Sequence, residues 1–456
     1  MVPSPSASAR NTHLNPPLVG GSKAEGFRGG GTAAPLPKLA SRPSTSPRGG
    51  GSIAFSRAVA AIAAVIVTLV SATAALADAA SDRWVQAFWP RAEAAGISWS
   101  TYSAALGNFE PDPSILERAS NQAEFVRPIW DYLDSAVSDE RIANGRAAMA
   151  EWAQTLARIE ATYGVDRHIL VAIWGIESSY GAVLSNPQIV RSTIRSLATL
   201  AYQGGSRQNF GQTQLIAALK ILQRGDITLA GMTGSWAGAM GHTQFIPTTF
   251  EAYAVDFNGD GRRDIWSSPV DALASAANYL RAMGWESGKT WGYEVVLPAG
   301  FNYSLAEGDG RRPLSEWASM GIRRANGQDF PRPGDAGDLW IPAGANGPAF
   351  LLLHNFRVIK RYNNADSYAL AVGHLADRLR DSGPFRVAWP RNALPLNQAQ
   401  RFELQQLLAS LGHYAGPIDA IVGGGTRAAI RDYQRTAGMT PDGYASDVLL
   451  QQLRRE

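Results

Sequence analysis

The sequence predicts a mainly α-helical protein, with one large central domain and a small three-helix domain at its C-terminus. Apolar residues recur at helical spacing in successive runs along the central part of the chain. The 46 Gly and 26 Pro among 456 residues predict long loops between these helices. A compact final segment has three further helical runs that are separated by turn sequences.

The first 77 residues are expected to lie outside this fold. Residues 1–52 are rich in Pro, Gly, Ser and Ala without any period, which predicts a disordered leader. Residues 53–77 have the parts of a secretory signal peptide: Arg57, an apolar run, and small residues that end in Ala-Leu-Ala. The apolar run is shorter than the ~18–20 residues of a membrane span. We therefore expect export and cleavage, with an uncleaved inner-membrane anchor as the alternative.

Charge and cysteine content exclude several classes of function. The chain has a formal net charge of +3, but residues 1–77 supply most of the basic excess. The remaining chain is slightly acidic, so the sequence gives no support for nucleic-acid binding. The absence of Cys excludes disulfides, thiol chemistry and a lipid-modified N-terminal Cys. The sequence also has no zinc-protease His pair, Walker loop, dinucleotide fingerprint or Gly-x-Ser-x-Gly elbow.

Residues 78–382 are expected to form the large domain, with short segments such as 293–297 that suit strands. Its helical runs lie near residues 140–163, 165–180, 190–203, 211–223, 270–283 and 365–381. Residues 383–395 contain several Pro and are expected to form a linker. The small domain is expected over residues 396–456, with helices that start near Leu396, Thr426 and Ser446.

The run from Asp166 to Gly181 places a carboxylate at the end of an apolar helix. Asp166 can cap the start of this helix, and Gly181 can supply the left-handed residue after its end. Glu177 lies one turn beyond Ile173, at the margin of the apolar face, where partial burial raises the pKa of a carboxyl. A raised pKa suits a general acid. The alternative is a solvated residue on an amphipathic helix.

Two further motifs place polar side chains in aromatic surroundings. The Gly-rich run 234–250 carries Ser235 and Gln244, and its glycines allow close approach of the backbone to another surface. In the run 360–369, Tyr362 and Asn363 precede a helix, and such side chains orient sugars through stacking and hydrogen bonds. Taken alone, the first motif also fits a packed loop and the second also fits a helix cap.

A run that begins at Asp256 matches the start of a calcium-binding loop. Its twelfth position is Ser267 rather than Glu, so the bidentate ligand must come from elsewhere, and Asp271 is the nearest candidate. Hard oxygen ligands suit Ca²⁺ better than zinc. The alternative is a polar turn without metal. The candidate ligands are Asp256, Asn258, Asp260, the carbonyl of Arg262, and Asp271.

In this order, the motifs resemble the catalytic domain of the membrane-bound lytic murein transglycosylase B family, which are lysozyme-like enzymes that act on peptidoglycan. The resemblance covers about residues 80–380. It rests on runs at residues 175–181, 234–247, 254–261, 266–272, 277–280 and 361–363. The final segment resembles small three-helix peptidoglycan-binding domains through runs that include Tyr414, Asp419 and Thr426, although Ala420 stands where those domains usually have Gly.

The resemblance implies a lysozyme-like fold and a role for each matched residue. Glu177 is implied as the single catalytic acid and base. The side chains implied to bind the sugar substrate are Ser235, Gln244, Tyr279, Tyr362, Asn363 and Tyr132. A structural calcium ion is implied in the loop that begins at Asp256. An arginine pair of the family is represented only by Arg207, which puts contacts to the peptide stem in question.

The resemblance also implies a reaction that consumes no water. Glu177 would protonate the leaving oxygen of the MurNAc-β-1,4-GlcNAc bond, and the C6 hydroxyl of MurNAc would close a 1,6-anhydro ring. Peptidoglycan glycan strands are the implied partner, and the missing lipid-modified Cys implies a soluble periplasmic form. Two alternatives stay open: a muramidase that uses water, and a non-catalytic wall-binding protein.

Overall fold

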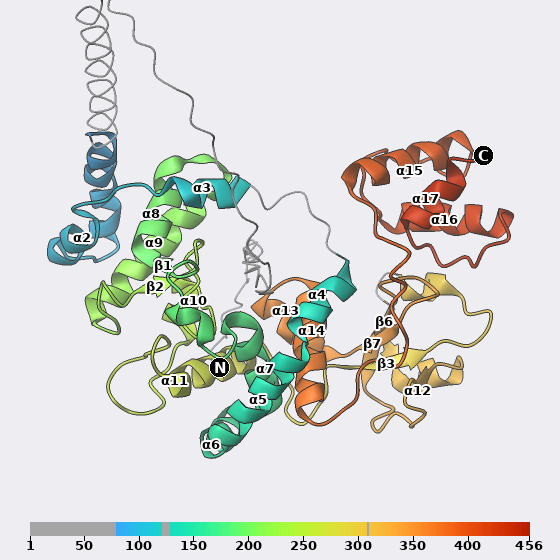
Figure 1. The fold of residues 1–456 in the computed structure, drawn as a ribbon, viewed down its shortest axis with the longest axis horizontal. Helices are drawn as coiled ribbons and strands as arrows, with labels where there is room; N and C mark the ends of the chain where they lie inside the picture. Colours follow the sequence, from blue (N-terminus) through green and yellow to red (C-terminus); the bar gives the residue numbers. More distant parts are fainter. Residues whose placement is uncertain (1–78, 121–127, 308–309) are drawn as a thin grey trace, which may run out of the picture.

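The computed structural model of the chain describes residues 79–120, 128–307 and 310–456. The predicted leader 1–52 and signal peptide 53–77 lie outside the described residues. Helices dominate the described chain, as predicted (Figure 1). Its buried apolar residues form separate hydrophobic cores. Within these three ranges, none of the helices combines the length and the apolar character that crossing a bilayer requires.

The first helical lobe is built on α8 (Thr193–Gln203) packed against α9 (Gln208–Arg224). Its apolar core includes Leu197, Leu215 and Phe250. The two-residue strands of this lobe, β1 (Arg191–Ser192) and β2 (Thr233–Gly234), pair antiparallel. The other elements of the lobe are a helix over residues 79–94, α2 (Trp99–Leu106), α3 (Pro113–Ser120), the 3₁₀ turn η2 (Gly205–Arg207) and α10 (Pro247–Tyr253).

The second helical lobe surrounds α7 (Arg167–Ser178), whose residues from Ile169 to Gly175 are all buried. The most extensive partner of α7 is α14 (Asp366–Leu379). The helical run at residues 140–163 is divided in two, because Trp152 leaves the helical conformation with φ −100° and ψ 18°. The other elements of this lobe are α4 (Ile129–Ala136), α5 (Asp139–Glu151), α6 (Ala153–Tyr163), η1 (Ala182–Ser185), α11 (Pro269–Ala282) and α13 (His354–Tyr362).

A small antiparallel sheet with strand order β4-β6-β7-β3-β5 lies beside the second lobe. Tyr293 of β3 pairs with Leu351 of β7, so the strand predicted at residues 293–297 is confirmed. Trp317 of the neighbouring helix α12 is fully buried in its core. The elements are β3 (Gly292–Val296), η3 (Tyr303–Ala306), β4 (Arg312–Pro313), α12 (Leu314–Ser319), β5 (Arg323–Arg324), β6 (Ala336–Trp340) and β7 (Ala349–Leu352).

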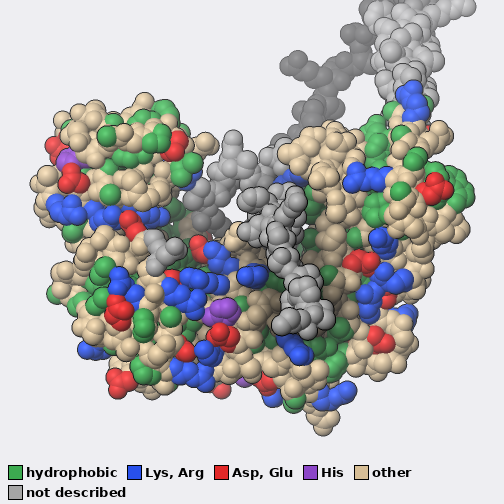
Figure 2. Space-filling view, turned by 180° about the vertical axis from the view of Figure 1, so that it is seen from behind, with side chains coloured by type: hydrophobic (Ala, Val, Ile, Leu, Met, Phe, Trp, Pro, Cys, Tyr) green, Lys and Arg blue, Asp and Glu red, His purple; other side chains and the backbone are tan. Residues whose placement is uncertain are grey.

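The three helices predicted for the C-terminal segment are confirmed as α15 (Gln398–Ser410), α16 (Gly424–Thr436) and α17 (Asp447–Leu453). They enclose an apolar core of their own. In Figure 2, which shows the molecule from behind, this small domain forms a lobe at the upper left. The Arg431 guanidinium, almost wholly buried, makes a bidentate ion pair with Glu307 beside the sheet, and this pair fixes the domain on the larger body.

Candidate active site

The helix that carries the candidate acid begins where the sequence predicts. Asp166 caps α7, because its Oδ1 accepts a 2.8 Å hydrogen bond from the backbone N–H of His168. Apolar residues such as Ile169 and Ile173 are buried against α14 and neighbouring helices. Packing on several sides therefore holds α7 firmly, and the position of Glu177 near its end is set by the core of the lobe.

The end of α7 differs in detail from the prediction. Gly181 has φ +89°, as expected for a left-handed residue, but the chain already enters this region at Ser179 (49°) and Tyr180 (59°). Three successive left-handed residues turn the chain sharply away from the helix axis. The hydroxyl of Ser178 accepts a 3.1 Å hydrogen bond from the Gly181 N–H, which stabilises the turn. Glu177 consequently lies one residue before the end of α7, at a partly buried corner of an otherwise buried helix.

Glu177 is half-buried at this corner, and its surroundings favour the neutral carboxyl. Burial raises the pKa of Glu177 to about 7. The hydroxyl of Tyr368 donates a 2.6 Å hydrogen bond to Oε1 of Glu177, and this bond acts to lower the pKa because it stabilises the charged form. A carboxyl that titrates near neutral pH can donate a proton and later accept one.

Three tyrosines from different helices share the electrostatic environment of Glu177. They are Tyr132 on α4, Tyr362 at the end of α13 and Tyr368 in the first turn of α14. Burial raises the pKa of each phenol, and the nearby Glu177 charge raises it further. The structure thus brings the predicted Tyr132 and Tyr362 together with Glu177. Sequence reasoning missed Tyr368, although it lies in the same 360–369 run as Tyr362.

An aromatic layer connects Tyr362 to the Gly-rich loop. The Tyr279 ring packs edge-on against Tyr362 with 5.3 Å between centroids, and Phe245 contacts both rings. The Tyr362 hydroxyl donates a 2.7 Å hydrogen bond to the Thr243 carbonyl, and the Tyr279 hydroxyl donates to the Arg361 carbonyl. These two bonds fix the orientation of both rings. The predicted residues Tyr279 and Tyr362 therefore belong to one rigid cluster.

His242 ties the Gly-rich loop to the end of α7. Its Nδ1 accepts a 3.0 Å hydrogen bond from Trp174 Nε1, and its carbonyl accepts a 2.6 Å hydrogen bond from the Ser178 hydroxyl. Burial lowers the pKa of His242 to about 4, so the ring is neutral and Nδ1 is free to accept at neutral pH. A Cβ at Gly181 would lie 2.4 Å from this ring. The loop that carries Gln244 is thus locked beside Glu177.

The remaining predicted sugar-binding side chains either form hydrogen bonds within their own loop or have no hydrogen-bond partner among the described residues. Ser235 Oγ accepts a 3.1 Å hydrogen bond from the Ala239 N–H, so this hydroxyl braces its own turn. Gln244 has φ +51° and donates from Nε2 to the Gly241 carbonyl at 2.9 Å. Asn363 Oδ1 is buried and has no hydrogen-bond partner among the described residues. Direct sugar contacts of these three side chains stay predictions.

The predicted calcium loop gathers three carboxylates. Asp256, Asp260 and Asp271 each place an oxygen within 4.8 Å of the others. The loop closes around Asp256, whose Oδ1 accepts from the N–H of Gly259 (2.7 Å) and whose Oδ2 accepts from the N–H of Gly261 (2.8 Å). Both glycines have positive φ, at 79° and 88°, which the tight turn requires. The folded loop therefore has the tight turn and the clustered carboxylates that the sequence pattern predicts.

Asp271 is the buried member of this cluster. Its Oδ1 accepts hydrogen bonds from the N–H groups of Phe257 (2.9 Å) and Asn258 (3.2 Å), and its Oδ2 accepts from that of Asp264 (3.2 Å). Burial raises the pKa of Asp271, and the charge of Asp256 adds to the effect. A bound divalent cation would offset both the desolvation and the repulsion between like charges. The oxygen-only donor set fits a hard cation such as Ca²⁺.

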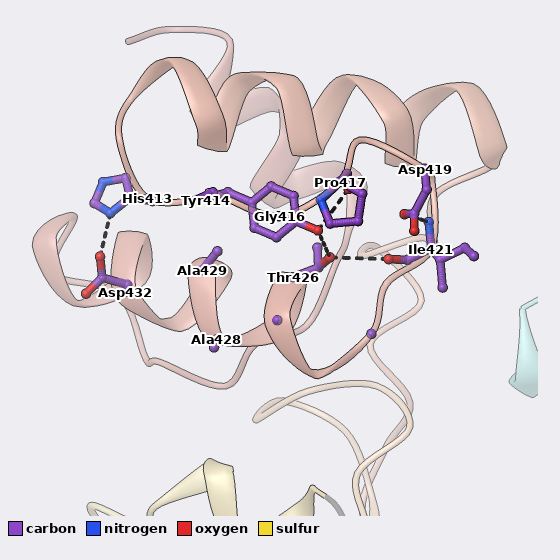
Figure 3. A pocket seen from close by; sticks show the side chains of 13 residues that line it. His413, Tyr414, Gly416, Pro417, Asp419, Ile421, Thr426, Ala428, Ala429 and Asp432 are labelled. Carbon is purple, nitrogen blue, oxygen red and sulfur yellow. Dashed lines mark hydrogen bonds and ion pairs between the residues drawn. The ribbon is translucent and has the colours of Figure 1, made fainter.

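The C-terminal domain carries a pocket of about 540 Å³ between α16 and the loop before it (Figure 3). The Tyr414 hydroxyl donates a 3.0 Å hydrogen bond to the Pro417 carbonyl and accepts a 3.4 Å hydrogen bond from Thr426 Oγ1, so the ring is held in place. At one end, the His413 ring contacts Asp432 at 2.7 Å. Small residues leave the space open: Gly416, Gly423, Gly425, Ala428 and Ala429.

Comparisons with known proteins agree with this geometry. The Transglycosylase SLT domain family matches residues 80–377, and the Putative peptidoglycan binding domain family matches residues 397–453. The membrane-bound lytic murein transglycosylase B of Escherichia coli (strain K12) is 31% identical over 275 residues, which are 59% of this chain and 71% of the relative. The first family covers more than half of the chain.

Solved structures give the same result. The chain resembles SltB3 from Pseudomonas aeruginosa, crystallised in complex with NAG-anhNAM-pentapeptide, with TM-score 0.76 and 51% identity over 82% of this chain and 99% of that one. It also resembles Slt35 of Escherichia coli, crystallised in complex with calcium, with TM-score 0.55 and 26% identity over 66% and 93% of the two chains. The chain therefore belongs to the peptidoglycan lytic transglycosylases with an SLT domain, as its motifs predict.

Proposed function

We propose that this lytic transglycosylase uses Glu177 alone, first as acid and then as base, to cut the MurNAc-β-1,4-GlcNAc bond. The observation that carries the proposal is the combination of a pKa near 7 at Glu177 with its hydrogen bond from Tyr368. The groups that share the environment of Glu177 are phenols, on Tyr132, Tyr362 and Tyr368. A single carboxyl that both gives and takes a proton suits a reaction in which the substrate supplies the nucleophile.

The bond changes balance without water. Protonated Glu177 donates its proton to the bridging oxygen as the bond from that oxygen to MurNAc C1 breaks, and GlcNAc leaves with a free 4-hydroxyl. The 2-acetamido group of MurNAc assists as C1 becomes cationic. The C6 hydroxyl oxygen then bonds to C1, and its proton goes to the Glu177 carboxylate. The products are a 1,6-anhydroMurNAc end, a GlcNAc end and the regenerated acid.

The surrounding residues are proposed to hold the sugar chain in the geometry that this ring closure needs. Tyr132 and Tyr362 stand beside Glu177, and Tyr279 supports Tyr362 through the aromatic layer. The Oδ1 of Asn363 is buried and has no hydrogen-bond partner within the described part of the chain, which supports a role as acceptor for a substrate hydroxyl or amide. Ser235 and Gln244 are proposed to face the same groove from the Gly-rich loop.

Calcium is proposed as a structural ion rather than a reactant. Asp256, Asn258, Asp260, the Arg262 carbonyl and Asp271 would hold it, and the three gathered carboxylates support this assignment. The ion would stabilise the segment after the Gly-rich loop and the start of α11, because Asp271 lies in the first turn of that helix. It supplies charge compensation only, and no proton transfer depends on it.

We also propose how the whole chain is used. The proposed domains are residues 78–382 and 396–456, with 383–395 between them, and the family matches over 80–377 and 397–453 support this division. The pocket beside Tyr414 is the proposed place where the small domain holds the wall polymer. Because this polymer lies outside the cytoplasmic membrane, residues 53–77 are proposed to direct export to the periplasm.

Substitution of the acid tests the proposal. Glu177→Gln is expected to abolish release of muropeptides from purified peptidoglycan while leaving folding and binding to insoluble wall intact. General acid catalysis contributes about 10²–10⁴-fold, so the loss is easily measured. Glu140→Gln, an exposed position on α5, serves as the control with full activity. Mass spectrometry of the wild-type products distinguishes anhydro ends from reducing ends, which are heavier by one water, and reducing ends alone would point to a hydrolytic muramidase.

A further inference from the structure

The segment over residues 385–394, which we call the strap, is packed on the catalytic domain along its length. The Phe385 ring stacks on His374 with 3.8 Å between centroids. Both oxygens of Glu294 accept hydrogen bonds from the N–H of Arg386, and Oε1 also accepts from that of Val387 at 2.8 Å. These contacts give the strap a defined position on β3 and α14, so it is not a free linker between the two domains.

Farther along, the strap contacts one face of α4. The Trp389 ring packs against the buried Trp130 with 6.0 Å between centroids. Arg391 makes a bidentate ion pair with Asp134, at 2.8 and 2.9 Å. Trp130 and Asp134 are four residues apart and so lie on the same helix face. The strap therefore holds α4 at two successive turns of that face.

Tyr132 lies midway between these two contacts. Residues two apart on a helix point in nearly opposite directions, because each residue turns the helix by about 100°. The strap holds the face with Trp130 and Asp134, and Tyr132 lies on the other face, where it packs against the apolar core that includes residues of α7 and α14. Since α4 has only eight residues, its place depends heavily on such contacts from other parts of the chain.

The strap also continues directly into the C-terminal domain. The N–H of Leu394 donates to Asp447 Oδ1 at 2.8 Å, and the N–H of Asp447 donates to the Leu394 carbonyl at 3.0 Å. Asp447 is the first residue of α17. Leu394 follows Arg391 by three positions, so the attachment to α4 and the attachment to the small domain are joined by very little chain.

We infer that Trp389 and Arg391 are positioning residues, which set the place of Tyr132 in the active site and couple it to the C-terminal domain. The inference rests on the proposed role of Tyr132 as a substrate-binding residue. An exposed ion pair by itself stabilises a protein little. The Arg391–Asp134 pair, however, is bidentate and adjoins the contact between Trp389 and Trp130, so together they restrict the orientation of α4.

A double-mutant cycle tests the inference. Arg391→Ala and Asp134→Ala are each expected to lower kcat/KM for release of anhydro-muropeptides by about three- to tenfold, mainly through KM. The exchanged pair, Asp134→Arg with Arg391→Asp, is expected to restore most of this loss. In a Tyr132→Phe background the same Arg391→Ala change is expected to have little further effect, because the side chain that the strap positions is already impaired.

The control is a matched ion pair that does not touch α4. Arg454 makes a bidentate pair with Glu403 at 2.7 Å for both contacts, with comparable exposure. Arg454→Ala is expected to leave kcat/KM unchanged. An unchanged KM in Arg391→Ala, or an undiminished loss in the Tyr132→Phe background, would overturn the inference. Failure of the proposed chemistry would instead appear as activity retained by Glu177→Gln, so the two outcomes are distinguishable.

Discussion

The hydroxyl of Tyr368 donates a 2.6 Å hydrogen bond to Oε1 of Glu177, across 191 positions of sequence. The bond exists because α14 is the most extensive packing partner of α7, and Tyr368 lies in the first turn of α14. It has two physical effects. It fixes the direction of the carboxyl group, and it opposes the rise in the Glu177 pKa that burial causes.

Tyr368→Phe separates these two effects. Without the hydrogen bond the charged carboxylate loses stabilisation, so the pKa of Glu177 is expected to rise above its present value of about 7. The alkaline limb of the profile of kcat/KM against pH should move to higher pH. The maximal rate should fall by about 10- to 100-fold, because a hydrogen bond to a charged group contributes ~1.5–3 kcal/mol. A lower maximum with an unmoved alkaline limb would show that Tyr368 does not affect the titration of Glu177.

The wild-type enzyme is expected to lose activity above neutral pH. The folded-state pKa of Glu177 is raised, so the protonated acid predominates below about 7 and is lost as pH rises through that value. Above this point kcat/KM should decrease by about tenfold for each pH unit. The same sign holds for stability: the contribution of protonated Glu177 is present at low pH and disappears as pH rises through about 7.

Glu177→Gln provides the check on stability, because it removes the titration without removing the side chain. Thermal unfolding followed across pH 4 to 8 should show a smaller decline between about pH 4.5 and 7, the ordinary and the raised pKa of Glu177, in the variant than in the wild type. Parallel curves for the two proteins would mean that Glu177 is not the group that titrates in this range.

Added calcium is expected to raise the midpoint of thermal unfolding, and chelator is expected to lower it. An ion that binds only the folded state stabilises it by about 2.7 kcal/mol at one hundred times its dissociation constant. Asp260→Asn should weaken this response, because it removes one carboxylate charge but keeps an oxygen for the hydrogen bond from the Arg262 N–H. Asp329→Asn, at an exposed position far along the chain, is the control. A midpoint insensitive to both calcium and chelator would exclude the site.

Local signals in the sequence predicted the parts of the site that depend on neighbours along the chain. The cap at Asp166, the buried face of α7 and the strand at residues 293–297 follow from residue order and spacing alone. The clustering of Asp256 and Asp260 follows from a short loop pattern, and Asp271 is the third carboxylate that the sequence predicts for this cluster. In each case the residues that matter lie within about fifteen positions of each other in the sequence.

The relations that the sequence did not predict join distant segments. Tyr368 is brought to Glu177 only by the packing of α14 on α7, and no spacing rule relates two such helices. The early left-handed turn at Ser179 accompanies two hydrogen bonds of the Ser178 hydroxyl, which accepts from the Gly181 N–H and donates to the carbonyl of the distant His242. The contacts of residues 385–394 with α4 were hidden because Pro-containing segments between domains usually indicate a free linker.

Gly181→Ala is expected to destabilise the protein and to disturb the active site. Gly181 has φ +89°, a conformation that costs an L-residue ~1–2 kcal/mol. Its added Cβ would also lie 2.4 Å from the His242 ring, which accepts a hydrogen bond from Trp174, while the His242 carbonyl accepts one from Ser178. Because His242 anchors the Gly-rich loop beside Glu177, moving this ring should reduce kcat/KM as well as stability.

The matched control is Gly225→Ala. Gly225 has φ +80°, and a Cβ there would meet no atom within 4 Å, so the substitution adds backbone strain without a clash. Chemical unfolding should show a loss of about 1 kcal/mol for this control and about 2–3 kcal/mol for Gly181→Ala. The control should retain its activity, since Gly225 ends α9 and its added Cβ would displace none of the described atoms. Equal losses in stability for the two variants would show that His242 yields to the new methyl group without cost, and that the loop beside Glu177 is less rigid than its hydrogen bonds indicate.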